Sequence, residues 1–269
     1  MKQRSGPWRR FKTHLCALAL VLALLTPPVP APAQEGRTVD LELALLVDVS
    51  SSVNDEEFRL QAGGLAAAFQ STVVIEAIRR AGPNGIAVGV VQWADHGLQQ
   101  VSVDWTLLRG EADTLRLAAR IASMPRLGDG GHTALGDALG FGLRELASNR
   151  FAGLRRVIDL SSDGRNNDGS PLRPARQEAI DRGVTINGLA ILNELPLLEQ
   201  YFRKYLIGGE GAFVMVARDY SDFAQAIADK LVREISSSPL SRHEAPSAVQ
   251  EARAEAPRPS KTGDLRQAR

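Results

Sequence analysis

The sequence predicts an α/β fold: a doubly wound, mostly parallel central sheet with one antiparallel edge strand and helices on both faces. Three observations predict it. Residues 43–47 and 86–93 are nearly continuous apolar runs, as in strands that are covered on both faces. Residues 99–105 alternate apolar and polar side chains, which indicates a half-exposed edge strand antiparallel to its neighbour. Segments with helical periodicity alternate with the strands.

The first 33 residues have the pattern of an export signal. They combine a start with five Lys and Arg and no Asp or Glu, an apolar stretch from Leu15 to Leu25, and the end Ala31-Pro32-Ala33. As a helix the stretch spans about 16 Å, roughly half the hydrocarbon core, so we expect no permanent membrane span. We expect cleavage after Ala33, loss of Cys16, the only cysteine, and a periplasmic or secreted protein. The export route, general secretory or twin-arginine, stays open.

Charge and composition divide the rest of the chain. Beyond residue 33 it has 27 of the 32 Lys and Arg and all 31 Asp and Glu, a net charge of −4, which gives no support for a nucleic-acid surface. We predict one domain over residues 34–236. Residues 237–269 contain almost no large apolar side chain, so they cannot bury enough surface to order themselves, and we predict a disordered tail.

Local signals predict the helices of the first half. Asn54 can cap a helix, with Glu57 three residues later completing a capping box. Gly63 and Gly64 in this helix indicate close packing on the sheet. A shorter helix around residues 74–80 follows and ends at a Gly-Pro-Asn-Gly stretch.

The second half continues the alternation of helices and strands. A helix near residues 111–122 leads to the Gly-rich loop 127–131, and another helix starts at Thr133. We interpret Trp93 and Trp105 as core or rim residues. The remaining predicted elements are an apolar strand within 155–164 that ends before Asp163, a helix at 173–182, a strand at 185–191, a helix at 195–206, a strand at 212–216 and a helix at 220–235.

Oxygen-bearing side chains begin where the first apolar strand ends. Asp48 follows this strand, and Ser50 and Ser52 continue it as D-x-S-x-S. In an extended loop this spacing can turn the three side chains the same way. Hard oxygen ligands without His or Cys favour Mg²⁺, or Mn²⁺ or Ca²⁺. Alternatively, the serines form a turn that caps the following helix.

Two later stretches extend this set. Thr133 stands at the mouth of a predicted helix, and Asp163 follows another apolar strand. Over residues 39–236 the chain resembles the von Willebrand factor type A (VWA) domain. The metal-ion-dependent adhesion site (MIDAS) of that family takes D-x-S-x-S, a Thr from a second loop and an Asp from a third. Residues 161–167 are similar to a bacterial exported branch of unknown function. The resemblance implies five metal ligands: Asp48, Ser50, Ser52, Thr133 and Asp163.

The resemblance also implies a binding module. In the family, the ion keeps one coordination position for an outside ligand, often a Glu or Asp carboxylate of a partner protein. We therefore expect a protein partner that supplies such a carboxylate, and no enzyme activity. The sequence does not specify the partner, the cation, the oligomeric state or the biological process.

Two alternatives stay open. A metal-dependent hydrolase or phosphotransferase could use Asp48, but haloacid-dehalogenase phosphotransferases need D-x-D, and here the third position is Ser50. A serine hydrolase would need the G-x-S-x-G elbow, which is absent, and His96 and His132 have no zinc-site spacing. The second alternative is a structural domain whose site binds no metal.

Overall fold

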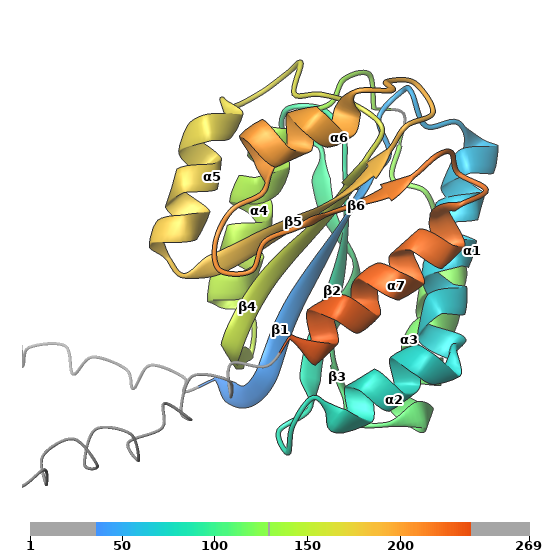
Figure 1. The fold of residues 1–269 in the computed structure, drawn as a ribbon, viewed down its shortest axis with the longest axis vertical. Coiled ribbons are helices and arrows are strands. Elements are labelled where there is room, and N and C mark those ends of the chain that lie inside the picture. Colours follow the sequence, from blue (N-terminus) through green and yellow to red (C-terminus); the bar gives the residue numbers. More distant parts are fainter. Residues whose placement is uncertain (1–35, 129, 238–269) are drawn as a thin grey trace, which may run out of the picture. The chain divides into compact units, whose positions relative to one another are not determined.

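The protein contains a six-stranded sheet with helices on both faces (Figure 1). The structure is a computed structural model, and it describes residues 36–128 and 130–237. The strand order is β3-β2-β1-β4-β5-β6; β3 is antiparallel to β2 and the other pairs are parallel, so the expected fold class is confirmed. The strands are β1 (Arg37–Asp48), β2 (Ile86–Trp93), β3 (Gln99–Leu108), β4 (Phe151–Ser162), β5 (Val184–Ile191) and β6 (Val214–Ala217).

The first strand, β1, lies in the middle of the sheet. It pairs in parallel with β2 on one edge, where Leu45 lies opposite Val90, and with β4 on the other, where Leu45 lies opposite Asp159. Every residue from Leu41 to Ser50 is buried. Because helices cover both faces of the sheet, both sets of alternating side chains on β1 enter a core, which explains its continuous apolar run.

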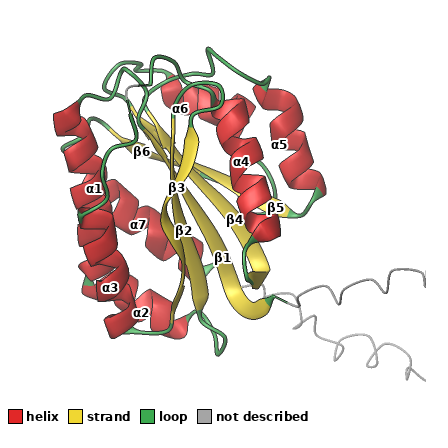
Figure 2. Ribbon diagram, turned by 180° about the vertical axis from the view of Figure 1, so that it is seen from behind, coloured by secondary structure: helices red, strands yellow, loops and turns green. Residues whose placement is uncertain are grey.

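The helices form two layers (Figure 2). One layer contains α1 (Asp55–Gln70), α2 (Thr72–Arg80), α3 (Glu111–Ala122) and α7 (Phe223–Ser236), and the other contains α4 (Leu135–Ser148), α5 (Leu172–Asp181), α6 (Leu198–Tyr201) and the π-helix η2 (Phe202–Leu206). Each layer encloses its own hydrophobic cluster against the sheet. Trp93 and Trp105 are buried in the second cluster, as expected.

The start of α1 agrees with the sequence, and one packing prediction does not. Asn54 accepts hydrogen bonds from the backbone of Glu57, whose side chain accepts from the backbone N–H of Asn54, so the capping box is present. The predicted packing of the Gly pair on the sheet is wrong. A Cβ at Gly64 would lie 3.0 Å from Ala224 Cα in α7, whereas a Cβ at Gly63 would meet nothing within 4 Å.

Three predicted boundaries near the C-terminal end of the domain shift. The helix expected at 195–206 is divided into α6 and η2 and starts only after residue 197. The strand expected at 212–216 is β6, and the last helix starts at Phe223 instead of Tyr220. Asp219 causes the last shift, because its side chain accepts hydrogen bonds from the backbone of Ser221 and Asp222 and closes a turn before the helix.

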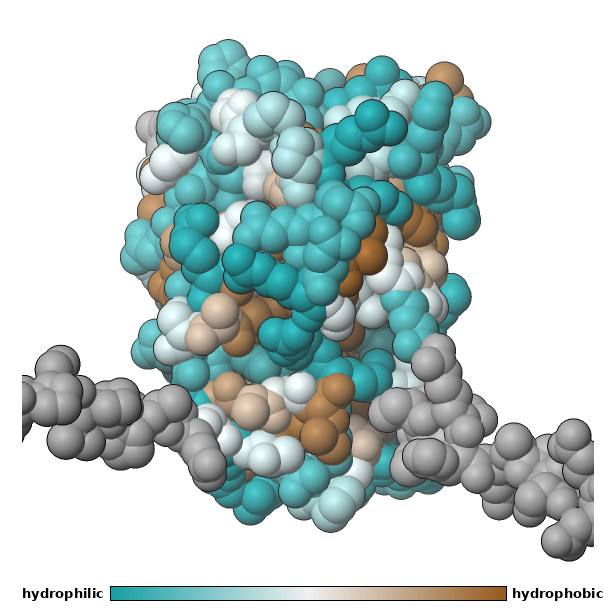
Figure 3. Space-filling model, turned by 90° about the vertical axis from the view of Figure 1, so that its left-hand side faces the viewer, coloured by the Kyte–Doolittle hydropathy of each residue, from teal (hydrophilic) through white to brown (hydrophobic). Residues whose placement is uncertain are grey.

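The surface shown in Figure 3 is mostly hydrophilic, with hydrophobic residues in separate small areas. This face therefore offers no large continuous apolar surface. In the part of the chain that the structure describes, no helix is both long enough and apolar enough to cross a bilayer. The predicted signal at 1–33 and the predicted tail at 237–269, except Ser237, lie outside the described residues.

Candidate metal-binding site

The five predicted ligand residues come together at the C-terminal edge of the sheet. Asp48 ends β1, Asp163 directly follows β4, and Thr133 lies just before α4. Because β1 and β4 are parallel neighbours, with Val47 opposite Ser161, the residues that follow them meet at one edge. In open α/β sheets this edge is where ligands bind.

Asp48 is fully buried and held by hydrogen bonds at both carboxylate oxygens. Its Oδ1 accepts from the backbone N–H of Ser50 at 2.8 Å, and its Oδ2 accepts from the hydroxyl of Ser162. Gln61 donates from Nε2 to the backbone oxygen of Asp48 at 3.1 Å. Burial, and next the negative charge of Asp163, raise the pKa of Asp48 to about 7. The site therefore favours a positive charge beside Asp48.

Asp163 is also buried, and two hydroxyls donate to it. The Ser52 hydroxyl donates to Oδ1 at 2.6 Å, and the Tyr220 hydroxyl donates to Oδ2 at 2.9 Å. Burial raises the pKa of Asp163, and the negative charge of Glu194 adds to the shift. Two carboxyl groups with raised pKa values thus share one buried site.

The three predicted hydroxyl ligands connect the two loops. Ser50 Oγ lies 3.2 Å from Ser52 Oγ, and Thr133 Oγ1 donates to Ser50 Oγ at 3.4 Å. Thr133 is not the N-cap of α4: Ala134 occupies that position, without a side-chain cap. The Thr133 side chain faces the serine hydroxyls instead.

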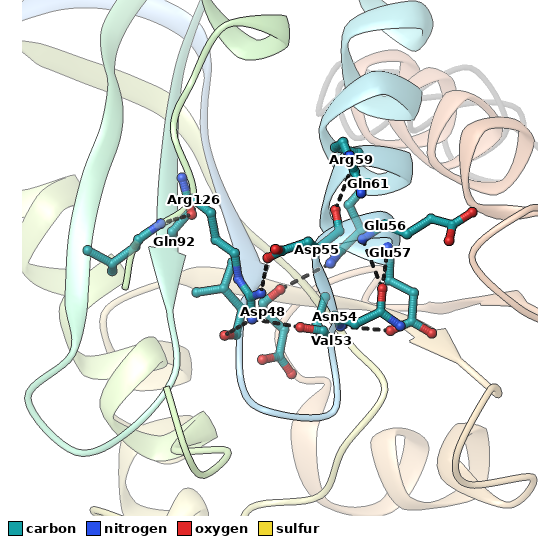
Figure 4. Close-up of polar contacts among 12 residues, drawn as sticks. Asp48, Val53, Asn54, Asp55, Glu56, Glu57, Arg59, Gln61, Gln92 and Arg126 are labelled. Carbon is teal, nitrogen blue, oxygen red and sulfur yellow. Dashed lines mark hydrogen bonds and ion pairs between the residues drawn. The ribbon is translucent and has the colours of Figure 1, made fainter. Parts of the chain in front are cut away.

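Arg126 holds the loop that follows Asp48. Its guanidinium donates to the backbone oxygen of Val53 at 2.6 Å and of Val49 at 3.3 Å, and it forms an ion pair with Asp55 at 2.7 Å. Figure 4 shows the Arg126 side chain between this loop and the start of α1. Gln92 accepts from the backbone N–H of the residue after Arg126 at 2.8 Å and so fixes the arginine's own loop.

Two asparagines hold the Thr133 loop. Asn167 Oδ1 accepts from the Thr133 backbone N–H at 2.7 Å, and Asn166 Oδ1 accepts from the Gly136 backbone at 2.9 Å. A Cβ at Gly164 would lie 2.8 Å from Thr133 Oγ1, so glycine lets the two loops approach. The two asparagines therefore join two separate loops.

The two histidines of the domain lie on neighbouring loops. His96 Nδ1 bonds Asp137 Oδ2 at 2.6 Å, and this hydrogen bond raises the pKa of the imidazole. His132 is exposed. In residues 36–128 and 130–237 no hydrogen bond joins either histidine to the five predicted ligands, and no three His, Cys, Asp or Glu side chains form a potential metal group. An ion at this edge would therefore depend on the serine and threonine hydroxyls.

The donor set fits a hard divalent cation. It combines two carboxylates with three hydroxyls, and each of the four residues Asp48, Ser50, Thr133 and Asp163 is buried. Two ionised carboxylates and a divalent cation together are neutral, which removes the like-charge repulsion inside the site. Oxygen ligands of this kind suit Mg²⁺, Mn²⁺ or Ca²⁺.

Sequence reasoning missed the residues that support the ligands. Ser162, Tyr220, Gln61 and Arg126 each hydrogen-bond a ligand or its loop. Ser162 carried a usable signal, since it is a hydroxyl at the end of the same strand as Asp163. Tyr220 and Arg126 carried none, because their contacts join parts of the chain that are far apart in sequence.

Comparisons with known proteins support this picture of the fold. A family model described as "Protein of unknown function (DUF1194)" matches residues 38–239. No curated protein matches the sequence.

Solved structures with a similar fold include proximal thread matrix protein 1 (PTMP1) from the mussel byssus, with 19% identity and a TM-score of 0.56 over 72% of this chain and 46% of that chain. A further PTMP1 structure, described as having a zinc-occupied MIDAS motif, has 17% identity and a TM-score of 0.53 over 75% of this chain and 49% of that one.

Two bacterial structures also match. A von Willebrand factor type A protein from Catenulispora acidiphila has 18% identity and a TM-score of 0.51, over 74% of this chain and 43% of that chain. The vWF domain of the pilus tip protein Mfa5 from Porphyromonas gingivalis has 14% identity and a TM-score of 0.51, over 74% and 95%. This chain thus spans less than half of PTMP1 and of the Catenulispora protein. The fold is that of a VWA domain.

Proposed function

Because the chain belongs to the family of proteins of unknown function DUF1194 and has a VWA fold, we propose that it is a binding module with a metal-ion-dependent adhesion site. The ligands of the proposed site are Asp48, Ser50, Ser52, Thr133 and Asp163. One observation carries the proposal: two buried carboxylates from two strand ends lie in one hydrogen-bonded group with three hydroxyls from two loops.

The bound cation is Mg²⁺ in this proposal, with Mn²⁺ and Ca²⁺ as alternatives. The zinc in one PTMP1 structure supports metal use by this fold without fixing the ion here. When bound, the cation supplies a positive charge that a partner's Glu or Asp carboxylate can reach. The protein side chains orient the site: Ser162 and Tyr220 hold the carboxylates, and Arg126 holds the loop of Ser50 and Ser52.

Export is part of the proposal. The basic and apolar start of the sequence favours a periplasmic or secreted protein. Structural neighbours include a byssus matrix protein and a pilus tip protein, which fits an exported adhesion role. We assign no enzyme activity to this chain. The position of Ser50 counts against an aspartyl nucleophile mechanism at Asp48.

Metal binding is tested with Mn²⁺, whose free-ion EPR signal falls when the ion binds. We expect weak binding, with a dissociation constant of about 1 mM. At that affinity 1 mM free metal stabilises the fold by only about 0.4 kcal/mol, so a thermal shift is a poor assay. Mg²⁺ should compete with Mn²⁺ for the site.

Two variants and a matched control make the test specific. Asp48→Asn should weaken Mn²⁺ binding more than about tenfold, because it removes a charged ligand, and Thr133→Ala should weaken it severalfold. Thr114→Ala is the control: Thr114 is equally buried but bonds the backbone of Gly110, beside the start of α3. A wild-type protein that binds no Mn²⁺ at millimolar concentration, or equal binding by all variants, would contradict the proposal.

A further inference from the structure

An exposed aromatic strip lies beside the loop that contains Asp163. We define it as Leu197, Tyr201 and Tyr205 of the α6–η2 segment, with the cations Arg165 and Lys204 stacked on its rings. Leu197 is 57% exposed and Tyr205 is 45% exposed. The two tyrosine rings are 5.0 Å apart, Arg165 lies 5.4 Å from the Tyr201 ring, and Lys204 lies 5.0 Å from the Tyr205 ring.

The aromatic strip is attached to the candidate metal site. The hydroxyl of Tyr201 accepts a hydrogen bond from the backbone N–H of Asn166 at 3.3 Å, and Arg165 is the second residue after Asp163. Two residues of chain span at most about 7 Å. The strip therefore lies beside the loop that contains Asp163, at the C-terminal edge of the sheet.

The backbone of this segment is unusual. Residues Phe202–Leu206 form a π-helix, which is rare in proteins and frequently found at functional sites. Phe202 and Leu206 are fully buried, while Tyr205 between them is exposed. A buried anchor thus supports an exposed tyrosine, and tyrosine and arginine are the residues most enriched in binding hot spots.

The charges around the site are unevenly distributed. Within residues 36–128 and 130–237, Arg165 and Lys204 have no acidic partner, whereas Arg203 pairs with Glu199 at 2.7 Å. Both cations of the aromatic strip can therefore pair with an acidic group of a ligand.

We propose that the aromatic strip binds a second acidic residue of a partner peptide whose first carboxylate reaches the metal site. The inference rests on the proposed function and adds the chemistry of the partner: an extended segment with two carboxylates. The second carboxylate pairs with Arg165, and apolar parts of the segment pack on Tyr205 and Leu197. We expect the two carboxylates about two to four residues apart in an extended peptide. Arg165 follows Asp163 by two residues, and Tyr205 lies one helical turn beyond Tyr201.

The experiment is a selection of displayed random peptides on the immobilised protein in Mg²⁺, with elution by chelator. We expect the selected peptides to share two acidic residues two to four positions apart. The best peptide is then synthesised in two forms, one as selected and one with the second acidic residue replaced by Lys. Binding of both peptides is measured by fluorescence anisotropy.

Variants of the strip are compared with matched controls at the opposite end of the domain. Arg165→Glu should weaken the selected peptide about tenfold and strengthen the Lys form, a coupling that a merely structural role would not give. Leu197→Ala and Tyr205→Ala should each weaken binding severalfold. The controls are Arg109→Glu, an exposed arginine at the end of β3, and Leu154→Ala, a leucine that is 66% exposed on β4; neither should change binding.

The outcomes separate the two proposals. If Arg165→Glu and Tyr205→Ala bind the peptide as tightly as the wild type, and binding is still lost in chelator, the inference is overturned and the proposed metal site is unaffected. Selected peptides with only one acidic residue would do the same. Arg165-dependent binding of heparin without any selected peptide would overturn it in favour of an anionic polysaccharide. If chelator elutes no selected peptide and the protein does not bind heparin, the inference and the proposed function are overturned together.

Discussion

Tyr220 donates a 2.9 Å hydrogen bond to Oδ2 of Asp163, a residue 57 positions earlier in the chain. Tyr220 lies in the turn between β6 and α7, so this bond joins the candidate metal site to the start of a helix that packs on α1. Ser52 donates to the other oxygen of Asp163. Both oxygens are therefore satisfied by the protein itself, which keeps a buried carboxylate in place before any ion binds.

Removing the tyrosine hydroxyl should destabilise the metal-free protein. Tyr220→Phe leaves Asp163 Oδ2 buried without its donor, and we expect the free energy of unfolding in chelator to fall by about 1–2 kcal/mol. Urea denaturation measures it. Tyr205→Phe is the control, because the Tyr205 hydroxyl makes no hydrogen bond among the described residues. Equal stability of Tyr220→Phe and wild type would show that the bond contributes nothing.

The resemblance to the VWA domain implied the grouping of the ligands, and the sheet supplies a physical reason for it. Asp48 and Asp163 each follow an apolar run, and the ends of parallel strands meet at one sheet edge. The supporting contacts depend on tertiary packing instead. Arg126 reaches a loop more than seventy residues earlier in the chain, and no periodicity or spacing predicts such a contact. Metal binding itself stays a prediction.

The fold, like the site, could be predicted where the signal is local and not where it depends on tertiary packing. Strands and helices with clear periodicity were predicted within a few residues; α3 lies at 111–122 as expected. The segment at 195–206 was predicted as one helix because its apolar spacing fits both an α-helix and a π-helix. The hydrogen bond from the backbone of Ile207 to Phe202, five residues earlier, distinguishes them, and apolar spacing alone does not predict this bond.

A buried charge cluster under α7 should make stability depend on pH. Burial, and next the charge of Asp159, raise the pKa of Glu234 to about 8, while Lys230 and Asn187 act in the opposite direction. The folded protein therefore binds this proton more tightly than the unfolded chain. This contribution to stability is fully present below about pH 4.5 and is lost as the pH rises toward 8, with a slope of at most about 1.4 kcal/mol per pH unit.

Glu234→Gln isolates this contribution, because the amide cannot titrate. Urea denaturation of both proteins between pH 5 and about pH 8 should give a difference in unfolding free energy that shifts against the wild type as the pH rises. Other groups that titrate, Asp48 among them, cancel in the difference. A difference that does not change with pH would mean that Glu234 has the same charge throughout this range.

Removing the buried positive charge of Lys230 should strongly destabilise the domain. Its ammonium lies 2.5 Å from Asp159 and 2.6 Å from Glu234, and all three side chains are buried. Lys230→Met leaves Asp159 buried without its cation, so we expect the free energy of unfolding to fall by about 3–5 kcal/mol. Lys204→Met, at an exposed position, is the control. If Lys230→Met is as stable as the control, the ion pair offers the fold no net stabilisation.

Gly164→Ala tests whether the approach of two loops determines metal affinity. The new Cβ would lie 2.8 Å from Thr133 Oγ1, so the threonine side chain must shift from its present position beside Ser50. Because the core below this edge is unchanged, we expect a folded protein with Mn²⁺ affinity reduced severalfold. Gly110→Ala is the control, since a Cβ there meets nothing within 4 Å. EPR titration measures the affinity, and the unfolding transition checks the fold. Unchanged Mn²⁺ affinity in Gly164→Ala would mean that the position of the Thr133 hydroxyl does not determine metal binding.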